Sequence, residues 1–131
     1  HGPGQLVGYP ILKLTDLGLK PRSYLRALEA VLIEALKPFG VEASALGGFT
    51  GLWVGKHKIA SIGVAVRAGV AYHGFALNMN ADLAPLRLIH PCRLESDSMT
   101  TMHKILGKPV DEHAVTKSVG QAMLKYFGGL K

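Results

Sequence analysis

Three side chains have types and positions that suit nucleophilic chemistry: Cys92, Lys58 and His90. Cys92 is the one cysteine of the chain. Pro91 ends an apolar run directly before it and delivers the thiol to a loop, where functional side chains tend to lie. The alternative is a small buried hydrophobic residue, the ordinary role of a lone cysteine. Because a free thiol has a pKa of about 8.5, a reactive Cys92 needs a nearby cation or base.

Lys58 and His90 are the two candidates for that partner. Strand alternation predicts that Lys58 shares a face with the apolar side chains of Ala60, Ile62, Val64 and Val66. A lysine withdrawn from water there acts more readily as a general base, whereas a lysine at a strand edge is ordinarily only solvated. His90 lies two residues from Cys92, so a strand would place base and nucleophile on one face, with Pro91 between them. The residues alone leave both partners open.

The sequence has no pattern typical of a metal or phosphate site. Its six histidines include neither an HxxxH nor an HExxH spacing, and one cysteine cannot build a cysteine-based zinc site. Gly2 and Gly4 belong to neither a GxGxxG nor a GxxxxGK motif. We therefore expect no metal and no phosphate-binding loop.

The composition is typical of one globular domain. The chain has 131 residues, of which 48% are hydrophobic and 18% charged, and no apolar run approaches the roughly 20 residues that span a bilayer. The single cysteine excludes a disulfide framework and favours a reducing compartment. The formal charge of +6 suits an acidic partner. Because the basic residues are scattered, without a basic arm or interleaved aromatic side chains, we expect no nucleic acid.

Apolar spacing and turn residues predict helices and strands alternating along the chain. The most regular helical pattern runs from Arg22 to Lys37, with Pro21 suited to its first turn. Two further helices are expected, at Met99–Leu106 and from an Asp111 N-cap to Phe127. The expected extended segments are Tyr9–Leu14, Val41–Ala43, Leu52–Val54 and Leu86–His90.

Two longer strands, Ile59–Val66 and Val70–Met79, are expected to form a hairpin. The intervening Arg67, Ala68 and Gly69 are typical of a three-residue connection that ends in glycine. This loop length predicts the register: Val66 faces Val70, Ile62 faces Gly74, Ser61 faces Phe75 and Lys58 faces Asn78, unless a bulge shifts it by one.

Four segments together resemble the octanoyltransferases of lipoate biosynthesis. They are HGPGQLVGYP (1–10), GLWVGKHKIASIGV (51–64), HGFALNMNADL (73–83) and LIHPC (88–92), and the similarity extends to TTMHKILGKPV (100–110). Their common order along nearly the whole chain makes the resemblance specific. It implies an α/β (α+β) fold, a mixed sheet with flanking helices, of the biotin/lipoate protein ligase catalytic-domain type.

The resemblance implies transfer of an octanoyl group from octanoyl acyl carrier protein to one lysine of a lipoyl domain, the first step of protein lipoylation. Cys92 matches the family's nucleophile and would carry the acyl group as a thioester. Lys58 matches its second catalytic residue and would favour the thiolate and exchange protons. The implied acceptors are lipoyl domains of 2-oxoacid dehydrogenases and the glycine cleavage H protein. The implied location is the cytoplasm, or the mitochondrial matrix in a eukaryote, without a membrane or cofactor.

The family's acyl-binding segments fall at His1 and on two triplets of the predicted hairpin. The triplets are Ser61, Ile62 and Gly63 on one strand, and Gly74, Phe75 and Ala76 on the other. Small residues across a strand pair leave room for a linear acyl chain, although the glycines could instead only permit twist or bulges. The family pattern extends upstream of His1, so residues 1–131 are expected to be a single acyltransferase catalytic domain that is incomplete at its N-terminus.

The chain departs from the family after Cys92, where Arg93 and Leu94 stand in place of a glycine-rich loop. Three alternatives to the transferase follow. An ATP-dependent lipoate or biotin-type ligase shares the related fold but needs no cysteine. A thiol hydrolase would use Cys92 with His90. An inactive fragment or half of a split protein would fold without catalysing a reaction.

Overall fold

The computed structural model describes residues 3–8, 12–13, 20–46, 50–67, 70–83 and 99–128. His1, His90, Cys92, Arg93 and the strand expected at Leu86–His90 lie outside these described residues. Of the strand expected at Tyr9–Leu14, Leu12 and Lys13 are described.

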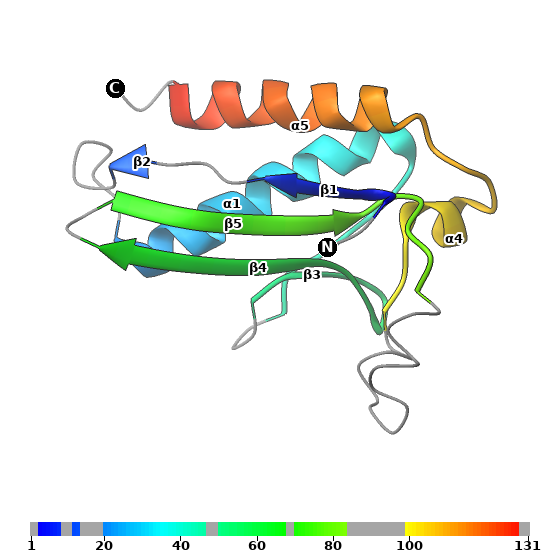
Figure 1. Ribbon diagram of the computed structural model, residues 1–131, viewed down its shortest axis with the longest axis horizontal. Helices are drawn as coiled ribbons and strands as arrows, with labels where there is room; N and C mark the ends of the chain where they lie inside the picture. Colours follow the sequence, from blue (N-terminus) through cyan, green and yellow to red (C-terminus); the bar gives the residue numbers. More distant parts are fainter. Residues whose placement is uncertain are drawn as a thin grey trace.

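The described strands form one sheet whose strand pairs are antiparallel (Figure 1). The order across the sheet is β1-β5-β4-β3, and β2 also pairs with β5. One parallel bridge joins Lys58 to Met99. The strands are β1 (Gln5–Gly8), β2 (Leu12–Lys13), β3 (Leu52–Val54), β4 (His57–Arg67) and β5 (Val70–Asn78).

The three predicted helices are present, but the one expected at Met99–Leu106 begins three residues later, because Met99 forms a bridge with Lys58 and Thr101 is the N-cap. Helix α1 (Pro21–Leu36) has proline in its first turn and continues into the 3-10 helix η2 (Lys37–Phe39). Helix α4 (Met102–Leu106) is capped by the Thr101 side chain, which accepts a hydrogen bond from the Lys104 backbone N–H. Helix α5 (Glu112–Phe127) begins at the expected Asp111 N-cap. These caps satisfy backbone N–H groups that have no partner within a helix.

The hydrophobic core lies between helix α1 and one face of the sheet. Leu28 and Leu32 of α1 are fully buried in one cluster with Leu52 of β3 and Leu77 of β5. Helix α5 packs against α1, and its Ser118 hydroxyl donates to the carbonyl oxygen of Ala35 at 2.8 Å. Figure 1 shows α1 behind the sheet and α5 along its upper side. The two long helices therefore support one face of the sheet.

The predicted helices and the β4–β5 hairpin are confirmed, but the predicted register is wrong by one residue. Arg67 pairs with Val70, and Ile62 pairs with Phe75 rather than with Gly74. Two residues therefore connect the strands instead of three. Two-residue connections are common in hairpins because their twist matches that of the strands, and the glycine of such a loop does not distinguish the two lengths.

The remaining strand predictions have mixed outcomes. The strand at Leu52–Val54 is confirmed with the expected bounds. Residues 41–43 form no strand, because backbone pairing with β3 is limited to Ser44, which pairs with Trp53.

Tyr24 provides a test of the packing between α1 and α5. Its ring is fully buried against Phe127, with ring centroids 5.7 Å apart. Within the described part of the chain its hydroxyl has no hydrogen-bond partner, and burial raises the pKa of Tyr24 to about 12. An unfolded tyrosine ionises near a pKa of about 10. The folded state therefore loses stability through Tyr24 as the pH rises from about 10 to about 12.

We expect Tyr24→Phe to reduce the fall in the free energy of unfolding across that pH range, as measured by urea denaturation. At pH 7 the variant should equal the parent or exceed it by up to about 1 kcal/mol, because it removes an unpaired buried hydroxyl. Tyr126→Phe, on the exposed side of α5, is the control. An equally steep alkaline loss in the parent and in Tyr24→Phe would contradict this account.

Candidate functional site

An extra residue in β4 decides which face of the sheet Lys58 occupies. Leu52 of β3 pairs with Ala60, and the next β3 residue, Trp53, pairs with Lys58. Ile59 therefore has no partner on β3. Such a bulge shifts the alternation of side chains by one position. Because Leu52 and Ala60 belong to the core, Lys58 lies with Trp53 on the opposite face.

The prediction that Lys58 shares a face with Ala60 and Ile62 is therefore wrong. It assumed unbroken alternation along β4, which the bulge interrupts. We call the side opposite α1 the helix-free face of the sheet, because no helix of the described ranges covers it. The residues that the pairing places on it are Trp53, Lys58, Ser61, Gly63, Gly74 and Ala76.

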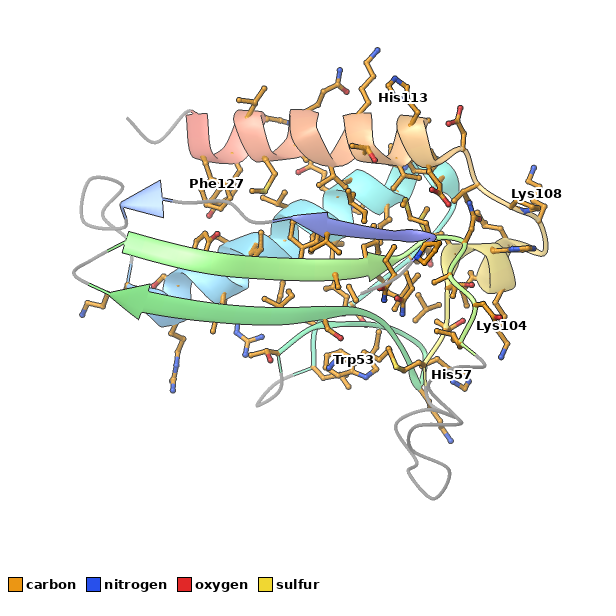
Figure 2. The ribbon with its side chains drawn as sticks, in the orientation of Figure 1. Trp53, His57, Lys104, Lys108, His113 and Phe127 are labelled. Atoms are coloured by element: carbon orange, nitrogen blue, oxygen red, sulfur yellow. The ribbon has the colours of Figure 1, made fainter. Side chains whose placement is uncertain are left out.

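The half-buried Lys58 side chain rests on an aromatic ring and a glycine. Its ammonium nitrogen Nζ is 5.6 Å from the centre of the Trp53 ring, a separation that permits a cation–π interaction. Its Cε lies 2.9 Å from the position that a Cβ on Gly51 would take. Figure 2 shows Trp53 and His57 together along the edge of the sheet remote from α5. Among the described residues, no carboxylate forms an ion pair with Lys58.

The backbone of Lys58 is bonded to the chain where it returns from the segment that contains Cys92. The carbonyl oxygen of Lys58 accepts a hydrogen bond from the Thr100 N–H at 2.8 Å. The buried Asn78 side chain donates to the Thr100 carbonyl oxygen at 3.1 Å and accepts from Gln5 at 2.8 Å. Thr100 is itself buried. Thr100, eight residues after Cys92 in the sequence, is thus held beside Lys58 by β4 and β5.

Small residues of β4 and β5 lie opposite one another on the helix-free face. Gly63 pairs with Gly74, and Ser61 pairs with Ala76. Gly63 is exposed, and a Cβ built on it would meet nothing within 4 Å. Gly74 and Ala76 are buried, so among the described residues the open space on this face lies beside Gly63.

The two larger residues of these triplets lie on the other face. Ile62 and Phe75 are buried in the core. A Cβ built on Gly8 would lie only 2.5 Å from the Phe75 ring. On the helix-free face they contribute backbone rather than side chains. The other predicted site residues, Cys92 and His1, lie outside the described residues, as does the alternative base His90.

The sequence reasoning missed Trp53, Gly51 and Asn78 as parts of the site. A signal for Trp53 was present, because the two-residue turn Gly55–Lys56, with Gly55 at φ +61°, places it opposite Lys58. Gly51 and Asn78 are recognised only through contacts that are distant in sequence.

Metal and membrane patterns are also absent from the described ranges. They contain no group of three histidine, cysteine, aspartate or glutamate side chains that could hold a metal ion. No described helix is long and apolar enough to cross a membrane.

The fold is that of the biotin and lipoate protein ligase catalytic domains. The chain superposes on apo biotin protein ligase from Aquifex aeolicus with a TM-score of 0.75 at 18% identity, covering 96% of this chain and 54% of that one. For a bipartite lipoate protein ligase from Thermoplasma acidophilum the TM-score is 0.74 at 15% identity, with 98% and 53% covered. At these identities the likeness shows the fold alone.

The sequence then defines the family within this fold. The model of the lipoyl protein ligase A/B catalytic domain matches residues 1–126, and the chain belongs to this family. It is 49% identical to an octanoyltransferase of Geobacter metallireducens over 119 residues, which are 91% of this chain and 56% of the relative. It is 42% identical to one of Syntrophobacter fumaroxidans over 127 residues, 97% and 56% of the two chains. The chain thus spans about half the length of these curated relatives.

Proposed function

We propose that this chain provides the catalytic centre of an octanoyltransferase that acts through a thioester on Cys92. The donor would be octanoyl acyl carrier protein, and the acceptor one lysine of a lipoyl domain. The main support is the bulge at Ile59, which places Lys58 on the same face as the Gly63–Gly74 pair. The relatives named octanoyltransferase support the transfer of an octanoyl group.

In the first half-reaction the Cys92 thiolate attacks the thioester carbonyl of the donor. A carbon–sulfur bond to Cys92 forms as the bond to the carrier sulfur breaks. The departing carrier thiolate takes a proton from the Lys58 ammonium and leaves as a thiol. Lys58 is then a neutral amine beside an acylated cysteine.

In the second half-reaction the amine of the acceptor lysine attacks the Cys92 thioester. The carbon–nitrogen bond forms, the bond to the Cys92 sulfur breaks, and neutral Lys58 takes a proton from the amine. The thiolate and ammonium of the starting state are restored. Exchange between thioesters is nearly balanced and conversion of a thioester to an amide is strongly downhill, so this cycle needs neither ATP nor a metal.

The octanoyl chain would lie along the helix-free face over Ser61, Gly63, Gly74 and Ala76, with His1 as a further contact. The backbone of Ile62 and Phe75 would line this path while their side chains support it from the core. The expected acceptors are the lipoyl domains of 2-oxoacid dehydrogenases and the glycine cleavage H protein. The reaction would take place in the cytoplasm, or in the mitochondrial matrix of a eukaryote.

Mass spectrometry of the full-length protein mixed with octanoyl carrier protein tests the thioester. We expect a mass gain of one octanoyl group in the parent and none in Cys92→Ser. Lys58→Met should lower the rate of acylation by about 10²–10⁴, the usual contribution of a positioned acid or base. Addition of a lipoyl domain should discharge the acyl group onto the domain.

The same mixtures distinguish the alternative functions. An ATP-dependent ligase would modify the lipoyl domain from free octanoate and ATP without Cys92. A thiol hydrolase would release octanoate and would lose activity in His90→Ala but not in Lys58→Met. If the folded parent protein forms no adduct, the proposal is contradicted and the inactive fragment is the alternative that remains.

Gly63 tests the path of the acyl chain separately from folding. A Cβ at this position meets nothing within 4 Å. The free energy of unfolding of Gly63→Ala should therefore equal that of the parent or exceed it by about 0.5–1 kcal/mol. Gly63→Leu should slow octanoyl transfer about tenfold or more, as expected where overpacking costs about 1–3 kcal/mol, and should slow transfer of a two-carbon acyl group less.

The matched control is Gly120→Ala on α5, where a Cβ also meets nothing within 4 Å. It should leave transfer of both acyl groups unchanged. Equal rates of octanoyl transfer for the parent and a folded Gly63→Leu would exclude this path.

The positive charge of the chain predicts electrostatic steering of an acidic donor. Lys104 and Lys108 are exposed on and after α4, at the end of the sheet where Thr100 meets Lys58 (Figure 2). We expect kcat/KM for the carrier-protein donor to fall about tenfold as salt rises from roughly 0.05 to 0.5 M. A small uncharged octanoyl thioester is the control donor. Equal salt dependence for both donors would exclude steering.

A further inference from the structure

We propose that Glu29 is a positioning residue for Lys58. Its buried carboxylate on α1 holds the backbone at Gly51, and Gly51 and Trp53 form the surface on which the Lys58 side chain rests. This inference rests on the proposed function of Lys58. It adds a second element, helix α1, to the parts of the fold that the transfer reaction requires.

Glu29 is buried, with 2% of its surface exposed. Its Oε1 accepts a hydrogen bond from the Arg26 guanidinium at 2.6 Å, and its Oε2 accepts one from the Gly51 N–H at 3.2 Å. A buried carboxylate is costly unless it is paired and hydrogen-bonded, and an apolar side chain often replaces a buried ion pair at no loss of stability. Core packing alone therefore does not account for a carboxylate at this position. The bond to Gly51, 22 positions along the sequence, does.

Gly51 provides a close contact surface for Lys58. Its φ of +131° lies in the region that favours glycine. A Cβ on Gly51 would lie 2.7 Å from the Ala60 carbonyl oxygen and 2.9 Å from the Lys58 Cε. The Lys58 side chain thus lies directly over Gly51, and any side chain at position 51 would displace it.

Trp53 completes this surface, and its position follows from that of Gly51. Its backbone N–H and carbonyl both bond to Ser44, at 2.9 and 2.8 Å, and its ring lies beside the Lys58 ammonium. The Gly51 N–H, which donates to Glu29, lies directly before this short strand and two residues before Trp53. Loss of that bond would let the strand shift, and the ring and the lysine would shift with it.

Residues 1–131 contain one tryptophan and one cysteine, so two local measurements are possible in this chain. Acrylamide quenching of Trp53 fluorescence reports the surface under Lys58, whatever the reaction. The pH profile of iodoacetamide alkylation of Cys92 reports how far Lys58 favours the thiolate. The variants are Glu29→Leu, Glu29→Gln and Lys58→Met, with Glu34→Leu as the control. Glu34 lies on the same helix in an exposed ion pair with Lys125.

Glu29→Leu should increase quenching of Trp53 and shift the alkylation profile to higher pH, as Lys58→Met does. At pH 7 the alkylation rate should fall about tenfold, the change expected when a thiol goes from roughly half ionised to a few per cent. Glu29→Gln keeps an acceptor for the Gly51 N–H and should retain the parent's profile. Glu34→Leu should change neither measurement.

A folded Glu29→Leu with the parent's quenching and alkylation profile would overturn the proposal, even if its melting temperature were lower. If Glu29→Leu does not fold, Glu29→Gln decides: a folded Gln variant that behaves like Lys58→Met would also overturn it. Failure of the proposed function is distinguishable, because Lys58→Met would then keep the parent's alkylation profile while Glu29→Leu still altered Trp53 quenching.

Discussion

The site depends on one unpaired residue, Ile59, in the strand that carries Lys58. A strand with unbroken alternation would turn Lys58 toward α1, where burial of an ammonium group without a partner is costly. The bulge instead buries Ile59 completely and turns the lysine to the opposite face. The sheet can therefore pack its apolar side chains against the helices and present a lysine on its other side from the same strand.

The surrounding contacts hold this geometry from three directions. On one side, Trp53 of β3 and Gly51, which directly precedes β3, contact the lysine side chain. On the other side, the carbonyl oxygen of Lys58 accepts a hydrogen bond from the Thr100 N–H, and the Asn78 side chain donates one to the Thr100 carbonyl oxygen. From the side of α1, the carboxylate of Glu29 accepts a hydrogen bond from the Gly51 N–H. Each partner lies far from Lys58 in sequence or on another strand, so folding of the whole domain is required to place one ammonium group.

Much of the architecture could be predicted from local patterns. The helix that begins at Pro21, the Asp111 cap and the strand at Leu52–Val54 follow from spacing and capping residues alone. The register of β4 and β5 was missed by one residue, because Gly69 suits either a two-residue or a three-residue loop. The pairing of Gly63 with Gly74 became visible only in the structure.

The face of Lys58 could not be predicted for a different physical reason. A bulge arises from the fit of a strand to its neighbours, and the β-branched Ile59 is as typical of a regular strand as of a bulged one. The role of Glu29 was hidden in the same way. A glutamate in an amphipathic helix indicates an exposed position, and only the contact with Gly51 shows that it is buried.

A crystal structure of the full-length protein acylated on Cys92 with an octanoyl group would test the central claim most directly. The measured quantities are the distance from Lys58 Nζ to the Cys92 sulfur and the path of the acyl chain. The account predicts hydrogen-bond contact, about 3–3.5 Å, and an acyl chain lying over Gly63 and Gly74 on the helix-free face. A Lys58 side chain directed toward α1, or an acyl chain buried between α1 and the sheet, would contradict it.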